Sequence, residues 1–306
     1  MHKLLFRLGQ YSRCTMVAEV MDESTKHQHN NRSLDQLLKG RVYIEELPSD
    51  IEPIRSLLEK YSGIRSKDVN EHIYRIRERL WDICPHVSIG HFRFLSLKFT
   101  LDPLYHVALG QLMARSSSNF LDVGCCVGQV LRQLALDGVD SSRLYGTDLE
   151  PRFLDAGFDL FKDKAKTQAT FVSGDMLRDG EGDGDLKVLE GKMGVIHATS
   201  FFHLFTWDDQ IRAAVRMVRF LDPDDPEAMI FGRNVGTTIP GVREGTGGSK
   251  KYLHNAESWQ NLWNEVGKLT GTSWRTEVND IEEPGMHLNS IADGTLRRIR
   301  YGVFRA

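Results

Sequence analysis

The chain has 306 residues, with a hydrophobic share of 41% and a charged share of 26%. These values predict one large folded domain, or one domain with a smaller appendage. The net charge of −3 and the pI near 6.4 exclude bulk affinity for nucleic acid or for an anionic membrane. No apolar run in the sequence approaches the roughly 20 residues that span a bilayer.

The N-terminal residues 1–39 predict a disordered tail, because the stretch DESTKHQHNNRS is polar and shows no period. Two alternatives stay open for this segment. Three basic residues precede the first acid, Glu19, which would also suit a mitochondrial presequence. The true start could also lie at Met16 or Met21, with the preceding residues upstream of it.

Residues 40–118 predict a helical cap over the active site. The stretch SDIEPIRSLLEKYSG has apolar residues on one helical face and Gly63 as a stop signal. The stretch VNEHIYRIRERLWD, residues 69–82, repeats its apolar residues at a spacing of four, three and four, which indicates a helix. Residues 84–106 are rich in aromatic and basic side chains without a clear period. They predict either a poorly patterned helix or a segment wrapped over a site.

From residue 119 to residue 306, short apolar runs alternate with helical patterns, which indicates βαβ units and a parallel sheet. The runs are NFLDV, RLYGTD, ATFVSGD, MGVIHA and AMIFG. Two further runs, SWRTEV and RIRYGVF, have no helix between them and predict an antiparallel hairpin. The expected fold is therefore a doubly wound, mostly parallel seven-stranded α/β sheet. Residues 233–255 contain five glycines and predict a long loop, either a lid or a disordered segment.

The stretch FLDVGCCVGQ, residues 120–129, predicts a strand, a glycine turn and a helix start. In a doubly wound sheet this first turn is where a cofactor binds. A dinucleotide would need the pattern GxGxxG, but only Gly124 and Gly128 are present, in the wrong register. Asp122 would also repel a pyrophosphate. A nicotinamide-dependent oxidoreductase is therefore disfavoured.

S-adenosylmethionine suits the turn better, because it has no phosphate and carries an ammonium at its amino-acid end. Asp122 would then supply a counter-charge, and Gly124 and Gly128 would let the backbone approach the ligand. The vicinal Cys125 and Cys126 are poorly placed to chelate one ion, so we expect no metal.

The quoted turn resembles motif I of the class I S-adenosylmethionine-dependent methyltransferases, with Cys126 in place of the middle glycine. The later strand ends are in register with that family. The resemblance implies that Asp148 accepts the ribose hydroxyls, that Asp175 accepts the adenine amino group, and that Met176 contacts the ring. It further implies cofactor contacts from two other positions, Leu149 and Cys125.

A narrower resemblance rests on five stretches: WDICPHVSIGHFRFL, DVGCCVGQVLRQL, LYGTDLEP, FFHLFTWDDQ and GRNVG. Together they are similar to fungal secondary-metabolite methyltransferases, which include enzymes that form methyl esters on meroterpenoid carboxylic acids. Such an ester would need a cation to orient the acceptor, and the candidates are His91, Arg93 and Arg233.

His203 in SFFHLF follows the fourth strand and is the candidate general base for a phenol or hydroxyl acceptor; its alternative is a packed histidine that closes the pocket. His197 lies within the strand and is expected to be structural. The predicted function is O-methylation of an acidic or phenolic small molecule, with a homodimer as a further expectation. The alternatives are a cofactor-binding protein with a non-methylating reaction such as cyclisation, and a non-catalytic binding subunit.

Overall fold

The computed structural model describes residues 39–40, 42–178, 184–244, 248–282 and 294–306. The predicted tail, residues 1–39, lies outside these residues except for Lys39. Among the described residues, no helix is both long and apolar enough to cross a membrane.

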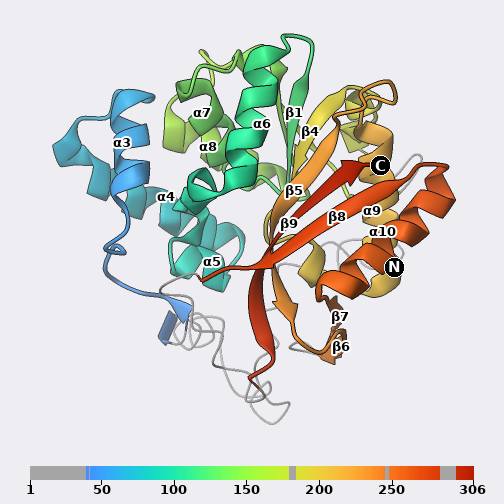
Figure 1. Ribbon diagram of the computed structural model, residues 1–306. Helices are drawn as coiled ribbons and strands as arrows, with labels where there is room; N and C mark the ends of the chain where they lie inside the picture. The colour runs from blue at the N-terminus through green and yellow to red at the C-terminus, as the bar shows by residue number, and fades with distance from the viewer. Residues whose placement is uncertain (1–38, 41, 179–183, 245–247, 283–293) are drawn as a thin grey trace, which may run out of the picture.

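A seven-stranded sheet forms the centre of the molecule, with the strand order β3-β2-β1-β4-β5-β9-β8 (Figure 1). The first five strands are parallel, and β9 runs antiparallel between β5 and β8. The order reverses between β1 and β4, where ligands bind in such sheets. The strands of this sheet are β1 Asn119–Val123, β2 Leu144–Asp148, β3 Thr170–Ser173, β4 Met193–His197, β5 Met229–Thr237, β8 Trp274–Asp280 and β9 Leu296–Arg305. The predicted seven-stranded, mostly parallel fold is confirmed.

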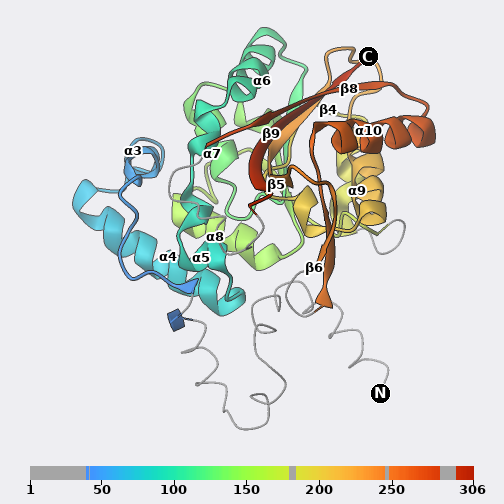
Figure 2. The same cartoon turned by 60° about the horizontal axis from the view of Figure 1, so that its bottom comes forward.

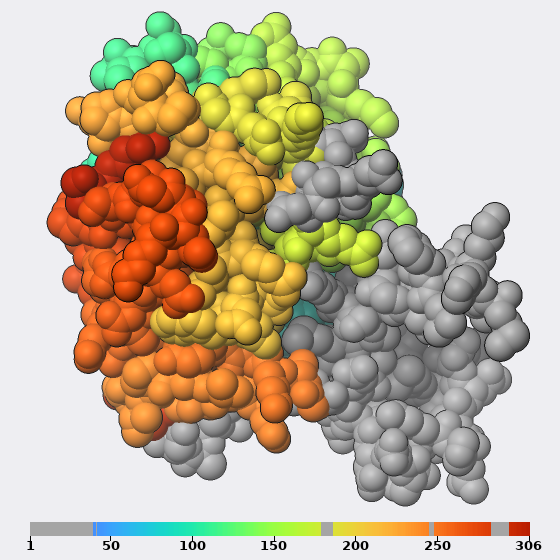
Figure 3. All heavy atoms as spheres, turned by 90° about the vertical axis from the view of Figure 1, so that its right-hand side faces the viewer, coloured from blue at the N-terminus to red at the C-terminus, as the bar shows by residue number. Residues whose placement is uncertain are grey.

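Alternating side chains place the two faces of the sheet in separate hydrophobic cores. Phe120 packs in the core with α6 and α7, whereas its neighbour Leu121 packs in the core with α9 and α10. Figure 3 shows α10 beside α9 on the second face. The helices on the first face are α6 Pro103–Ala114, α7 Gln129–Leu136 and α8 Pro151–Phe161, and those on the second are α9 Trp207–Phe220 and α10 Ala256–Thr270.

The N-terminal helical region extends the first core outward (Figure 2). The predicted helices are present as α3 Glu52–Lys60 and α4 Val69–Ile83. The segment without a clear period folds as short turns: α5 Val87–Gly90, η4 Arg93–Leu95 and η5 Lys98–Leu101. Because these turns are too short to show a helical period, the pattern alone did not reveal them. The boundary between residues 118 and 119 stays a prediction.

The prediction of a long loop over residues 233–255 is wrong, because much of this segment forms strands. The fifth strand continues to Thr237, because β9 offers nine paired positions from Phe304 back to Leu296. An antiparallel hairpin follows, with β6 Gly241–Glu244 paired to β7 Lys250–Leu253. The Tyr252 N–H donates to the Phe205 carbonyl at 2.9 Å, which holds this hairpin against the end of η9, Phe202–Leu204.

Candidate active site and cofactor pocket

The glycine turn after β1 has left-handed backbone at three alternate positions. The φ angles are 72° at Gly124, 50° at Cys126 and 67° at Gly128. The N–H groups of Gly124 and Cys125 both donate to the carbonyl of Thr147, at 2.8 and 3.0 Å. These bonds tie the turn to β2. Cys126 therefore adopts a conformation that favours glycine, and this explains why glycine is usual at its position.

A buried ion pair supports the turn from below. Arg132 on α7 donates to both carboxylate oxygens of Asp163, at 2.8 and 3.0 Å, and its Nη1 donates to the carbonyls of Val127 and Gly128 at 3.2 and 3.3 Å. The hydroxyl of Tyr61 also donates to Asp163, at 2.9 Å. Burial and the charge of Asp163 raise the pKa of Tyr61 to about 12. The turn is thus held by Arg132 on α7 together with side chains that lie just after the ends of α3 and α8.

Asp148 ends β2 beside this turn. One of its oxygens accepts from the Cys126 N–H at 2.9 Å and the other from the Glu150 N–H at 3.1 Å. Burial raises the pKa of Asp148 to about 6, and the negative charge of Asp122 adds to the effect. Both of these partners are neutral backbone N–H groups, so the carboxylate is suited to a further ligand that donates hydrogen bonds, such as a ribose diol.

Asp122 lies on the other side of the turn. One of its oxygens is 2.7 Å from Nδ1 of His197, and both side chains are buried. Cys125 lies close to both acids, and burial together with the charges of Asp122 and Asp148 raises the pKa of its thiol. Two carboxylates therefore border one turn, an arrangement that fits a ligand with a cationic end and a diol.

The remaining predicted cofactor residues lie at the ends of β2 and β3. Met176 is buried in the second core, and Leu149 is 39% exposed. The Asp175 carboxylate accepts from the Leu177 N–H at 3.0 Å, and its backbone carbonyl accepts from Arg216 at 3.2 Å. The roles of Asp175, Met176 and Leu149 in cofactor binding stay predictions.

His203 lies at the carboxyl end of β4, in η9. Its Nδ1 is 3.1 Å from Oδ1 of Asn234, an oxygen that also accepts from the Phe201 N–H at 3.2 Å. This pairing places a proton on Nδ1 and leaves Nε2 with a lone pair. Burial, followed by the charges of Arg298 and Lys251, lowers the pKa of His203 to about 3. The ring is therefore neutral at pH 7.

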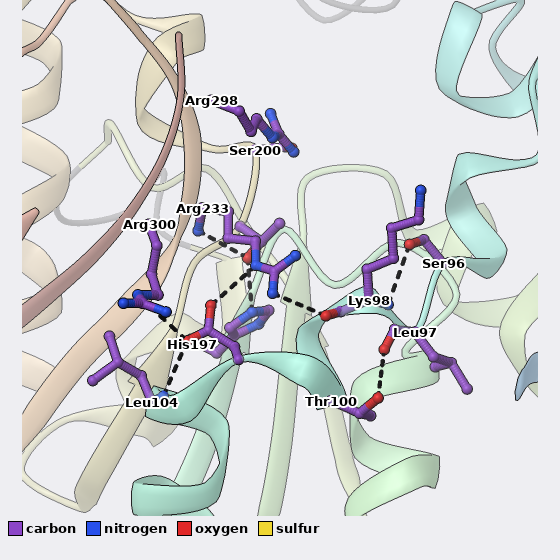
Figure 4. Close-up of polar contacts among 12 residues, drawn as sticks. Ser96, Leu97, Lys98, Thr100, Leu104, His197, Ser200, Arg233, Arg298 and Arg300 are labelled. Carbon is purple, nitrogen blue, oxygen red and sulfur yellow. Dashed lines mark hydrogen bonds and ion pairs between the residues drawn. The ribbon is translucent and has the colours of Figure 1, made fainter. Parts of the chain in front are cut away.

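Arg233 does not meet His203 through any described contact. Its Nε donates to Asp102 at 3.0 Å and its Nη2 donates to the Lys98 carbonyl at 2.9 Å (Figure 4). It thereby joins β5 to the segment before α6. Arg93 lies close enough to His91 and His86 to lower the pKa of both, after the effect of burial. The substrate-binding roles of His91, Arg93 and Arg233 stay predictions.

Two further residues near the end of β4, Asn234 and Arg298, were not predicted from the sequence. Arg298 lies on β9 and donates to the Ser200 hydroxyl at 3.2 Å, as Figure 4 shows. The alternation in RIRYGVF could have placed Arg298 and Arg300 on one face of that strand. Among the described residues, no group of three or more His, Cys, Asp or Glu could hold a metal ion.

Comparisons with known proteins match two parts of the chain to family models. Residues 42–95 match the meroterpenoid methyltransferase N-terminal domain, and residues 120–224 match a methyltransferase domain. The described geometry agrees with the second match, because the glycine turn and both carboxylates lie within it.

Three fungal relatives extend the similarity over most of the chain. O-methyltransferase phiE from Fungal sp. is 42% identical, and the match covers 79% of this chain and 80% of that protein. O-methyltransferase atr3 from Stereocaulon alpinum is 36% identical, with 87% and 77% covered. The asnovolin E/chermesin D methyltransferase nvfJ from Aspergillus novofumigatus is 37% identical, with 77% and 85% covered. The chain belongs to this family of fungal secondary-metabolite methyltransferases, and its cofactor is S-adenosylmethionine.

Proposed function

We propose that the protein forms a methyl ester on a carboxylic acid of a meroterpenoid or polyketide. The observation that carries this proposal is the positive charge around His203. Arg298 on β9 and Lys251 on β7 both lower its pKa, and Arg298 donates to the nearby Ser200 hydroxyl at 3.2 Å. Cations from two strands therefore converge at the carboxyl end of β4, where the acceptor must meet the methyl group. A carboxylate is the acceptor that this field would attract.

S-adenosylmethionine supplies a methyl group on a sulfonium, and its transfer to an acceptor oxygen leaves S-adenosylhomocysteine. A carboxylate acceptor is already ionised at neutral pH, so no residue has to remove a proton from it. Because His203 is neutral, the charge that holds the acceptor comes from Arg298 and Lys251. The protein then contributes by orienting the acceptor and excluding water.

The relatives support the substrate class. The family model that matches residues 42–95 is the N-terminal domain of meroterpenoid methyltransferases, and one relative is named as a methyltransferase of asnovolin E and chermesin D. The identity of the acceptor in this protein is a proposal.

The test compares meroterpenoid or polyketide acids with their matched primary alcohols and phenols. We expect products that are one methylene heavier from the acids alone, and mild alkali should reverse the mass change because it cleaves esters but not ethers. Arg298→Gln should raise KM for the acid about tenfold to hundredfold through loss of a charged contact. Arg275→Gln is the matched control, because Arg275 is exposed and pairs with Glu277. Alkali-stable products would overturn the ester assignment.

A phenol or hydroxyl acceptor is the alternative that one contact favours. Asn234 holds Nδ1 of His203, so Nε2 is placed to accept a proton. Against this alternative, a pKa near 3 makes His203 a weak base for a phenol. Alkali-stable products together with loss of turnover in His203→Gln would establish it.

Two further proposals concern the setting of the enzyme. We propose a cytoplasmic location, because the four cysteines (Cys14, Cys84, Cys125 and Cys126) show no CxxC spacing and suit free thiols in a reducing compartment. Fractionation of the source cells would test it. A homodimer is supported by exposed apolar side chains on and beside α6, with Leu101 80%, Val107 48% and Met113 58% exposed. Sedimentation equilibrium would distinguish the dimer from a monomer.

A further inference from the structure

A chain of buried hydrogen bonds lies next to the glycine turn after β1. The Nδ1 atom of His197 is 2.7 Å from Asp122, and its Nε2 atom is 2.8 Å from the hydroxyl of Thr199. That hydroxyl accepts from the Arg233 N–H at 3.2 Å. In Figure 4, His197 lies below Arg233, next to the segment that contains Lys98. These hydrogen bonds join β1, β4 and β5 at the point where the strand order reverses.

The ring of His197 is fixed in one orientation. Asp122 and His197 are neighbours in the β1–β4 register, so their side chains share one face of the sheet. Three aromatic rings surround the imidazole, with centroids at 5.0 Å for Phe231, 6.0 Å for Phe99 and 6.4 Å for Phe120. The ring is 3% exposed and both of its nitrogens have a hydrogen-bond partner, so packing and hydrogen bonds together favour this orientation.

This contact occupies one carboxylate oxygen and leaves the other available. Within the described residues, Oδ1 of Asp122 accepts from His197, and no hydrogen bond involves Oδ2. The carboxylate is close enough to Cys125 and Asp148 to raise the pKa of both, which places it at the cofactor turn. The pattern needs only a neutral imidazole, with one donor and one acceptor. An arginine or lysine partner would instead cancel the charge that an ammonium needs.

We propose that His197 is a positioning residue that orients Asp122 toward the ammonium of the cofactor's amino-acid end. The inference rests on the cofactor and on the assignment of Asp122 to that end, and it does not depend on the identity of the acceptor. Failure of the ester proposal would therefore leave it intact.

The test uses two ligands that differ only at the amino-acid end. S-adenosylhomocysteine carries the ammonium, whereas 5′-methylthioadenosine has the same adenosine and a thioether without it. Calorimetry gives the Kd of each for the wild-type protein and two variants. The side-chain nitrogen of asparagine can replace Nδ1 of His197, and that of glutamine can replace Nε2. His197→Asn thus keeps a donor for Asp122, whereas His197→Gln loses it and keeps the Thr199 contact.

In His197→Gln we expect S-adenosylhomocysteine to bind about tenfold to hundredfold more weakly, as for loss of a hydrogen bond to a charged group. The Kd of His197→Gln for 5′-methylthioadenosine should stay within about twofold of the wild-type value. In His197→Asn, most of the lost affinity for S-adenosylhomocysteine should be recovered. Equal weakening of both ligands would overturn the proposal, because it would show a purely structural role.

A third variant keeps the proposal testable if both His197 variants fail to fold. Asp122→Asn should weaken S-adenosylhomocysteine selectively, because the ammonium then loses its counter-charge. If His197→Gln folds, adding it to Asp122→Asn should weaken that ligand no further. An unchanged ratio of the two Kd values in Asp122→Asn would overturn the proposal. If the wild-type protein bound neither ligand, the cofactor assignment itself would fail, and the proposal with it.

Discussion

Removal of Arg132 tests whether the buried ion pair beneath the glycine turn stabilises the fold as its geometry implies. The Arg132 and Asp163 side chains are only 2% and 3% exposed. Arg132→Met keeps the apolar length of the side chain among its aromatic neighbours but leaves the Asp163 carboxylate buried. Among the described residues, the only side chain that then still donates a hydrogen bond to Asp163 is the hydroxyl of Tyr61.

The expected loss of unfolding free energy is about 3–5 kcal/mol, the usual effect of removing one partner of a buried pair. For a chain of this size it corresponds to a Tm lower by about 6–10 °C. Arg132→Met/Asp163→Leu should recover at least half of the loss, because no charge then remains buried without a partner. Thermal and urea unfolding of the single and double variants would measure both effects.

Arg152 provides a matched control for burial. It makes two contacts to Glu150, both at 2.8 Å, but its side chain is 53% exposed. Solvent screens such a pair, so Arg152→Met should change the unfolding free energy by less than about 1 kcal/mol. If Arg132→Met and Arg152→Met changed stability equally, the argument from burial would be refuted.

Four further predictions concern binding, stability and turnover. Asp148→Asn should weaken S-adenosylhomocysteine about tenfold to hundredfold by calorimetry, and a change within twofold would contradict the ribose assignment. Because burial raises the pKa of Asp148 to about 6, wild-type affinity should be constant above pH 7 and fall as the pH drops through 6, since protonation removes the negative charge and turns one acceptor oxygen into a donor. The fall should level off near the loss seen in Asp148→Asn, which should not show this dependence. Arg233→Leu leaves the buried Asp102 carboxylate with the Leu104 N–H at 3.0 Å and Arg300 at 3.8 Å, and should lower the unfolding free energy by about 3 kcal/mol in urea, whereas a loss below about 1 kcal/mol would argue against a bracing role. His203→Gln should retain measurable turnover on an acid acceptor, and a 10²–10⁴-fold loss, about what removal of a general base causes, would contradict a carboxylate nucleophile.

The sequence alone determined the sheet and the glycine turn after its first strand, because both depend on local patterns. Alternating and helical periods repeat within about ten residues and indicate strands and helices directly. The glycines of the turn reflect backbone conformation at single positions, and the φ angles of 72° at Gly124 and 67° at Gly128 agree with that reasoning. The family motifs then placed Asp122 and Asp148 at the ends of β1 and β2.

Only the tertiary structure decided which partners these residues meet. Asp122 and His197 are 75 positions apart and meet because β1 and β4 are adjacent, an order that no local period encodes. Arg233 is 131 positions from Asp102, so the sequence, which suggested a substrate-binding role for Arg233, does not reveal their ion pair. The β6–β7 hairpin was missed for the same reason, since short polar strands become visible only through the partners with which they pair. Charge, burial and hydrogen bonding at the site depend on contacts across the fold, and these arise only when the chain is folded.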